Sequence, residues 1–277
     1  MSVLQTYKLK QIKSPLNYIG GKAKLLDQIL PLFPKEIDNF IDLFAGGCNV
    51  GINVNANKIY CNDILTYLIE MYKTFQENDL DTTIQHIENR VRQFNLSLTN
   101  EDGYKQMRLL YNEQKNPLDL FVLIAFSFNH QIRFNNSHEF NNPFGRERSS
   151  FNATMKQNLE KFIIRIKETN IGFANVCFNH FDFSNFGVND FVYCDPPYLI
   201  TTGTYNDGKR GFKGWTTKEE NELLNLLDNL DEQDIKFALS NVLEHKGKSN
   251  YQTIIRDKNA SIEVLKSNNF TFKIWLN

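Results

Sequence analysis

The sequence predicts a doubly wound α/β fold, a parallel sheet wrapped by helices, with a long insertion between two of its strands. The apolar segment 40–44 runs into the turn Gly46-Gly47, and a second apolar segment, 59–62, follows it as in a β-α-β unit. A third apolar segment, 191–194, is followed by two prolines, which end a strand because they lack N–H groups. Residues 64–125 carry apolar side chains at helical spacing without a strand pattern, so the insertion lies there.

Near the N-terminus, the turn Gly20-Gly21 follows Tyr18 and precedes Lys22. Glycine allows the backbone to come close to a ligand, and the flanking residues add a ring and a cation. The turn leads into a helix that we expect over 23–33, where a proline follows and ends it. A Gly-Gly-Lys turn also commonly caps a helix, so this motif alone predicts little.

The second glycine turn lies between two predicted strand ends. The strand at 40–44 precedes Gly46, and the next strand ends at Asp63, about 20 residues downstream, where β-α-β units place an acid that binds a ribose. The glycines do not follow the G-x-G-x-x-G pattern, which argues against a dinucleotide oxidoreductase and for a cofactor without a pyrophosphate. The alternative is a tight strand-to-helix turn without a ligand.

The insertion continues beyond its first helices. Residues 126–148 leave the helical pattern for a hairpin with its turn at 135–138, and a basic amphipathic helix follows at 152–168. Asparagine, arginine and phenylalanine are frequent in the hairpin, and these residues suit base edges and base faces. We expect His130 and His138 to be solvated loop histidines, not metal ligands.

The α/β pattern resumes after the insertion. We expect a strand at 176–178 with Asp182-Phe183 at its end, and later a helix capped by Thr216 or Thr217 with two acids in its first turn. A further strand is predicted at 235–241. Between these elements, residues 199–214 hold four glycines and no sustained apolar pattern, which predicts a mobile loop over the site.

The strand at 191–194 places Asp195 at its carboxyl end, where open α/β sheets bind ligands. Pro197 holds Pro196 in an extended conformation, so the Pro196 carbonyl has a fixed direction, and Tyr198 adds a ring. A carboxylate, a free carbonyl and an aromatic ring together suit an exocyclic amine on a flat heterocycle. The alternative is a proline turn beside an ordinary surface acid.

Composition narrows the function classes. The hydrophobic share of 41% is typical of a soluble globular protein. The net charge is −1, so any positive charge that binds DNA must be concentrated in part of the chain. Residues 1–24 carry five lysines and no acid, and residues 144–168 carry six basic and three acidic residues. The four cysteines are widely spaced, which predicts neither zinc nor disulfides and fits a reducing cytosol. We see no signal core and no membrane-length apolar run, so we expect neither export nor an anchor.

Asp-Pro-Pro-Tyr at 195–198 resembles the catalytic motif of amino-group DNA methyltransferases, and the order of the motifs resembles their Dam-like adenine-N6 branch, the D12 class or alpha group. The resemblance implies a Rossmann-like S-adenosylmethionine-dependent methyltransferase sheet, formed by a catalytic domain of 1–63 and 171–277. It makes 64–170 a target-recognition insertion. The implied activity is transfer of a methyl group from S-adenosyl-L-methionine to N6 of a flipped-out adenine in double-stranded DNA, in a GATC or other GA-containing site. It implies a cytoplasmic enzyme without a metal, with a cognate restriction endonuclease as a separate partner.

The resemblance also assigns site residues by position. The catalytic residues are Asp195, Pro196, Pro197 and Tyr198. The cofactor residues are Tyr18 and Lys22 at its amino-acid end, Asp63 on the ribose, Asp182 and Phe183 at its adenine, and Phe44, Ala45, Gly46 and Asp195. The DNA-binding residues are the duplex wedge Phe128 and Asn129, the guanine reader Arg133, and Pro143 and Arg146 further along.

The chain departs from the family pattern in two places. His130 stands where many members have a glycine after Asn129, which leaves the recognition sequence open. The segment 256–265 resembles the last antiparallel strand but follows Asn241 closely, which predicts that a helix–strand unit of at least about 15 residues is missing at a sheet edge. The shortened tail leaves a catalytically inactive DNA-binding relative open as an alternative, and N4-cytosine methylation is another, because cytosine presents a similar amine.

Overall fold

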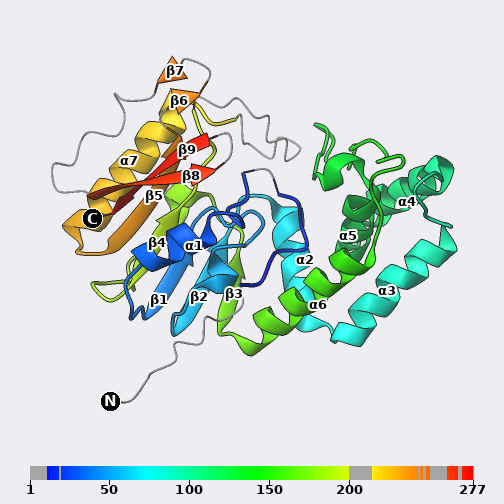
Figure 1. The fold of residues 1–277 in the computed structure, drawn as a ribbon, viewed down its shortest axis with the longest axis horizontal. Coiled ribbons are helices and arrows are strands. Elements are labelled where there is room, and N and C mark those ends of the chain that lie inside the picture. The colour runs from blue at the N-terminus through cyan, green and yellow to red at the C-terminus, as the bar shows by residue number, and fades with distance from the viewer. Residues whose placement is uncertain are drawn as a thin grey trace.

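A seven-stranded sheet forms the centre of the described part of this computed structural model, which covers residues 11–18, 20–199, 214–242, 244–245, 248–249, 261–267 and 270–276. The strand order is β3-β2-β1-β4-β5-β9-β8 (Figure 1). The parallel strands are β1 (Asn39–Asp42), β2 (Lys58–Asn62), β3 (Ile171–Ala174), β4 (Phe191–Cys194) and β5 (Lys236–Val242). The order reverses between β1 and β4, the position where open α/β sheets bind ligands. The predicted doubly wound sheet is confirmed.

The helices begin where the sequence supplies caps. Asn100, Asn116 and Asn152 accept hydrogen bonds from backbone N–H groups of the helices that follow them, and Thr216 forms a capping box with Glu219. The α-helices are α1 (Leu26–Ile29), α2 (Thr66–Glu77), α3 (Leu80–Gln93), α4 (Glu101–Gln114), α5 (Pro117–Phe126), α6 (Ala153–Glu168) and α7 (Thr217–Glu232).

The helix expected over 23–33 is shorter than predicted. It consists of α1 and a 3₁₀ helix, Leu30–Leu32, because Pro31 has no N–H to continue the α-helical ladder. The turn after Gly46 likewise leads into the short 3₁₀ helix Gly51–Asn53 and not into an α-helix.

Helices α2 to α6 lie between β2 and β3 in the sequence and gather beyond β3 at one side of the sheet (Figure 1). Helix α5 is buried on every side and forms the centre of this body. The buried side chains of α5 belong to the same hydrophobic cluster as those of the sheet. Helix α2 joins the two parts directly, because its Tyr72 ring lies 5.3 Å from Phe162 on α6 and 5.2 Å from Phe173 on β3. The insertion therefore shares one core with the sheet.

The hairpin at 126–148 is irregular. Isolated bridges join Ser127 to Phe144 and Phe134 to Phe140, and the backbone turns at 135–138 as predicted. The Phe134 ring stacks on Tyr67 of α2 with centroids 4.5 Å apart, so the hairpin is fixed to the helical body by aromatic packing.

The strand predicted at 176–178 is wrong. The strand is β3, which ends at Ala174, and a 3₁₀ helix follows at Phe178–His180. The cause is the side chain of Asn62, whose amide oxygen accepts from Val176 N at 2.9 Å and whose amide nitrogen donates to Val176 O at 2.9 Å. These bonds satisfy the Val176 backbone, so it does not join a strand ladder.

The missing edge strand predicted for the tail is also wrong. The edge is occupied by β8 (Ser261–Ser267), and the antiparallel neighbour of β5 is β9 (Phe270–Leu276), not the segment 256–265. Between β5 and β8 the described residues form the small hairpin of β6 (Glu244–His245) and β7 (Lys248–Ser249). The expected mobile loop falls at 200–213, outside the described residues.

The described part of the chain contains no helix with both the length and the apolar character needed to span a bilayer. Within the same residues, no three His, Cys, Asp or Glu side chains gather as a metal site.

Candidate active site

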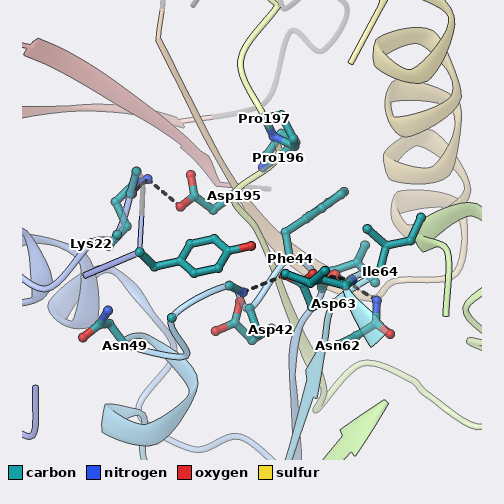
Figure 2. Close-up of a pocket in the computed structure, with 18 of the residues that line it drawn as sticks. Lys22, Asp42, Phe44, Asn49, Asn62, Asp63, Ile64, Asp195, Pro196 and Pro197 are labelled. Carbon is teal, nitrogen blue, oxygen red and sulfur yellow. Dashed lines mark hydrogen bonds and ion pairs between the residues drawn. The ribbon is translucent and has the colours of Figure 1, made fainter. Parts of the chain in front are cut away.

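A large pocket lies at the carboxyl ends of β1, β2 and β4 (Figure 2). Its lining comes from the N-terminal segment, the strand ends and the hairpin at 126–148. The predicted site residues that line it are Tyr18, Lys22, Phe44, Ala45, Gly46, Asp63, Asp195, Pro196, Pro197 and Tyr198.

The second glycine turn holds Asp63 in place. Gly46 has a positive φ of 46° and donates its N–H to Asp63 Oδ2 at 2.9 Å, while Leu65 N donates to Asp63 Oδ1 at 2.9 Å. The ring of Tyr18 lies so close that a Cβ on residue 46 would come within 2.7 Å of it, which explains the glycine. A carboxylate oxygen carries two lone pairs and can accept more than one hydrogen bond.

Asp195 is bound on both oxygens by side chains of the pocket. Lys22 Nζ lies 2.5 Å from Asp195 Oδ2 (Figure 2). The Tyr198 hydroxyl donates to Asp195 Oδ1 at 2.7 Å. Lys22 also donates to Tyr198 Oη at 2.6 Å and to Gly20 O at 2.9 Å, and its side chain is 3% exposed. Burial raises the pKa of Tyr198, and the negative charge of Asp195 raises it further. The ammonium group therefore compensates the charge of a carboxylate at the centre of the site.

Asp42 is a third carboxylate of the pocket, which the sequence reasoning missed. It ends β1 with 2% exposure and accepts from Gly51 N at 3.0 Å. Burial raises its pKa to about 7, and the charges of Asp195 and Asp63 add to the rise against the opposing Gly51 bond. An acid inside the apolar run 40–44 is the signal that could have indicated it.

The predicted adenine contacts Asp182 and Phe183 lie outside this pocket. Asp182 is exposed and accepts from Ser184 N at 2.9 Å, which lowers its pKa, and Phe183 packs against Phe181 with ring centroids 4.9 Å apart. Phe178 lines the pocket instead. The shift follows from the earlier end of β3, which moves the pocket wall upstream of 182.

Comparison with known proteins identifies the family of this chain. A family model described as D12 class N6 adenine-specific DNA methyltransferase matches residues 18–270. The chain belongs to this family. It is 57% identical to the Type II methyltransferase M.FokI of Planomicrobium okeanokoites over 86% of this chain and 37% of that protein. It is 56% identical to the modification methylase StsI of Streptococcus sanguinis over 87% of this chain and 37% of that protein. A DNA adenine methylase of Escherichia coli is 27% identical over 84% of this chain and 82% of that protein. The chain thus spans 37% of the length of M.FokI and of StsI.

In this D12-class chain the hairpin at 126–148 borders the pocket. Residues 130–132 line it, whereas the predicted wedge residues stand outside: Phe128 is 40% exposed, and the Arg148 guanidinium lies 4.8 Å from its ring centroid. Asn129 has a positive φ of 54°, and its carbonyl accepts from Asn17 Nδ2 at 3.1 Å. The hairpin therefore joins the pocket wall and an exposed surface in one segment.

His130 and His138 are half-buried, less exposed than we expected for solvated loop histidines. His130 lines the pocket with a positive φ of 53°, and its Nδ1 lies 3.3 Å from Ile124 O. The position of His130 in the pocket wall and its contact with Ile124 account for its partial burial.

The other predicted DNA contacts are exposed but have protein partners. Arg133 donates from Nε to Asn141 Oδ1 at 2.9 Å and from Nη2 to Asn141 O at 3.2 Å. Pro143 is exposed, and Arg146 pairs with Glu101 at 2.7 Å. Arg133 keeps guanidinium N–H groups beyond these bonds, because the group carries five.

The basic cluster at 144–168 serves largely to hold the fold. Lys156 pairs with Glu88 at 2.7 Å, Arg165 donates to Ile52 O at 2.9 Å, and Lys167 donates to Gln76 O at 2.6 Å. Sequence counts of basic residues cannot reveal such internal partners.

Proposed function

We propose that the chain transfers a methyl group from S-adenosylmethionine to N6 of an adenine flipped out of double-stranded DNA. The observation that carries this proposal is the position of Asp195, which shares a pocket with Asp63 on one side and with residues 130–132 of the recognition hairpin on another. A base and a cofactor bound there would meet at one carboxylate. The family description, N6 adenine-specific, favours adenine over N4-cytosine and an active enzyme over an inactive relative.

The residues present fit S-adenosylmethionine. Asp63 offers a carboxylate as acceptor for ribose hydroxyls, and we assign Tyr18 and Lys22, which line the same pocket, to the amino-acid end. The pocket is lined by the carboxyl groups of Asp42, Asp63 and Asp195 and by the ammonium group of Lys22, an excess of acid that suits a ligand with positive sulfonium and ammonium groups. When bound, the cofactor supplies a methyl group activated by its positively charged sulfur.

The chain's own residues prepare the adenine amine. The Asp195 carboxylate and the Pro196 carbonyl accept its two N–H hydrogens and draw the N6 lone pair out of conjugation with the ring, while Tyr198 stacks on the base. The amine hydrogen replaces the Tyr198 hydroxyl at Asp195 Oδ1, while Lys22 at Oδ2 holds the carboxylate in position. With the cofactor bound, the N6 lone pair would form a bond to the methyl carbon as the carbon–sulfur bond breaks and its electron pair stays on the sulfur, and Asp195 Oδ1 would pass one N6 proton to solvent. This arrangement acts on charge that develops in the transition state.

Recognition follows from the insertion, which we propose to be residues 64–170, with 1–63 and 171–277 as the catalytic part. Phe128 and Asn129 enter the duplex, and Arg133 reads a guanine in a GATC or other GA-containing site. Pro143 and Arg146 contact DNA further along. We place the enzyme in the cytoplasm, with a cognate restriction endonuclease as a separate partner.

The test is methylation of duplex DNA with labelled S-adenosylmethionine, followed by mass spectrometry of the nucleosides. We expect N6-methyladenine from the wild type and loss of transfer in Asp195→Ala with cofactor and DNA binding retained, because the lost acceptor acts on the transition state. Asp182→Ala is the matched control, an acid outside the pocket, and should retain turnover. N4-methylcytosine as the product, or substantial turnover by Asp195→Ala, would refute the proposal.

A further inference from the structure

Three aromatic rings meet at the end of the pocket next to Asp63. The Trp215 centroid lies 5.7 Å from Phe44 in an edge-on arrangement and 5.5 Å from Phe178, and Phe44 lies 5.4 Å from Phe178. All three line the pocket together with Ile64, which follows Asp63 in the chain. Figure 2 shows Ile64 on the side of Asp63 opposite to Lys22. The pocket therefore has a polar end and an aromatic end.

Trp215 is held by groups on two rigid elements. Its indole Nε1 donates to Glu220 Oε2 at 2.5 Å, and Glu220, in the first turn of α7, is 2% exposed. Asn241 on β5 is fully buried and donates from Nδ2 to Glu220 Oε1 at 3.2 Å. Burying a carboxylate is costly, so its use to orient an indole indicates that the orientation of the ring matters.

We infer that Trp215 is a cofactor-binding residue that forms an aromatic box with Phe44 and Phe178 around the adenine of the methyl donor. This inference rests on the proposed function. If Asp63 binds the ribose of the cofactor, the attached adenine lies either toward Lys22 or toward the aromatic rings. Only the aromatic end is lined by rings that can pack on a flat heterocycle, so we place the adenine there. Asp182 and Phe183, which the sequence assigned to this adenine, lie outside the pocket. Glu220 is then a positioning residue that acts through Trp215.

The test measures binding of S-adenosylhomocysteine by calorimetry, without DNA. Trp215→Leu should raise the dissociation constant of S-adenosylhomocysteine about tenfold or more, which is the effect of losing one base–aromatic contact. Trp215→Phe should recover most of the affinity. Glu220→Gln keeps an oxygen for the indole N–H and should bind as the wild type does, whereas Glu220→Leu should weaken binding as Trp215→Leu does. A thermal melt of each variant shows that it is folded.

Tryptophan fluorescence gives a second readout of binding, and it leaves all residues of the proposed site unchanged. The chain has two tryptophans, so Trp275→Phe leaves Trp215 as the reporter, and its emission should change in a saturable manner with S-adenosylhomocysteine. Two results would overturn the inference: affinity within twofold of wild type in Trp215→Leu while Asp63→Ala loses binding, or no emission change as calorimetry records binding. Absence of binding by the wild type would instead refute the proposed function, and the inference with it.

Discussion

Asp42 makes the stability of this protein depend on pH in a direction opposite to that of most acids. Its folded-state pKa is about 7 because the group is buried near Asp195 and Asp63, against an ordinary value of 3.8. The folded chain therefore binds this proton more tightly than the unfolded chain does. The stability that this proton contributes to the folded state is fully present below pH 3.8 and is lost as the pH rises to about 7. Above that pH, the effect of Asp42 on the free energy of unfolding is constant. At about 1.36 kcal/mol for each pH unit, the cost above pH 7 is about 4 kcal/mol.

Asp42→Asn removes this cost while keeping an amide oxygen that can accept from Gly51 N. We expect the variant to be more stable than the wild type at pH 8 by up to about 4 kcal/mol, and the two to converge near pH 4. The measurement is urea unfolding without cofactor at several pH values between 4 and 8, with midpoint and m-value compared. Parallel stability curves for the two proteins would show that Asp42 does not titrate as argued.

Asp182→Asn is the matched control for this series. Asp182 is exposed, and hydrogen bonds to Ser184 lower its pKa, so its replacement should give no gain at pH 8. Asp42→Asn should also weaken binding of the cationic cofactor, because it removes one negative charge from the pocket. An acid that costs stability at neutral pH and is kept at a ligand site is a common compromise between stability and activity.

Three further substitutions test the site. Asp63→Ala should weaken cofactor binding about tenfold or more, since bonds to a charged acceptor contribute about 1.5–3 kcal/mol, with DNA affinity changed only a few-fold; a loss confined to DNA binding would remove Asp63 from the cofactor site. Tyr198→Phe should keep turnover within about tenfold because the ring stays, while Tyr198→Ala should lose base stacking worth about 1–3 kcal/mol; equal losses would contradict the stacking role. Arg133→Ala should cost about 1–3 kcal/mol at a single guanine position, whereas an equal loss on GATC duplexes and on duplexes lacking that G would indicate a phosphate contact.

The sheet and the central acids could be predicted because the sequence marks them locally. Prolines end β4 beside Asp195, and the glycine turn and Asp63 lie at the spacing of a β-α-β unit. Such signals depend on a few adjacent residues. Backbone rules alone therefore place both carboxylates at one edge of the sheet.

The parts that could not be predicted depend on contacts between distant residues. Val176 leaves the sheet because of the side chain of Asn62, which is 114 positions away. Trp215 lines the pocket with its indole N–H bound to Glu220, and Glu220 is in turn bound by Asn241 of β5; nothing adjacent to Trp215 in the sequence indicates this. In the tail, the prediction followed the family pattern in place of the residues themselves, and the pairing of β8 with β9 corrects it.

The N-terminal segment joins the two halves of the site. Asn17 donates to the carbonyl of Asn129 in the recognition hairpin, and its neighbour Tyr18 packs on Gly46, which in turn donates to Asp63. Asn129 and His130 both hold positive φ, a conformation that side chains keep only where the surroundings fix it. The residues that fix the hairpin are thus continuous with those that shape the glycine turn at Gly46. We propose that this continuity couples the two proposed sites, so that a saturating cofactor changes DNA affinity; linkage then requires DNA to change cofactor affinity by the same factor.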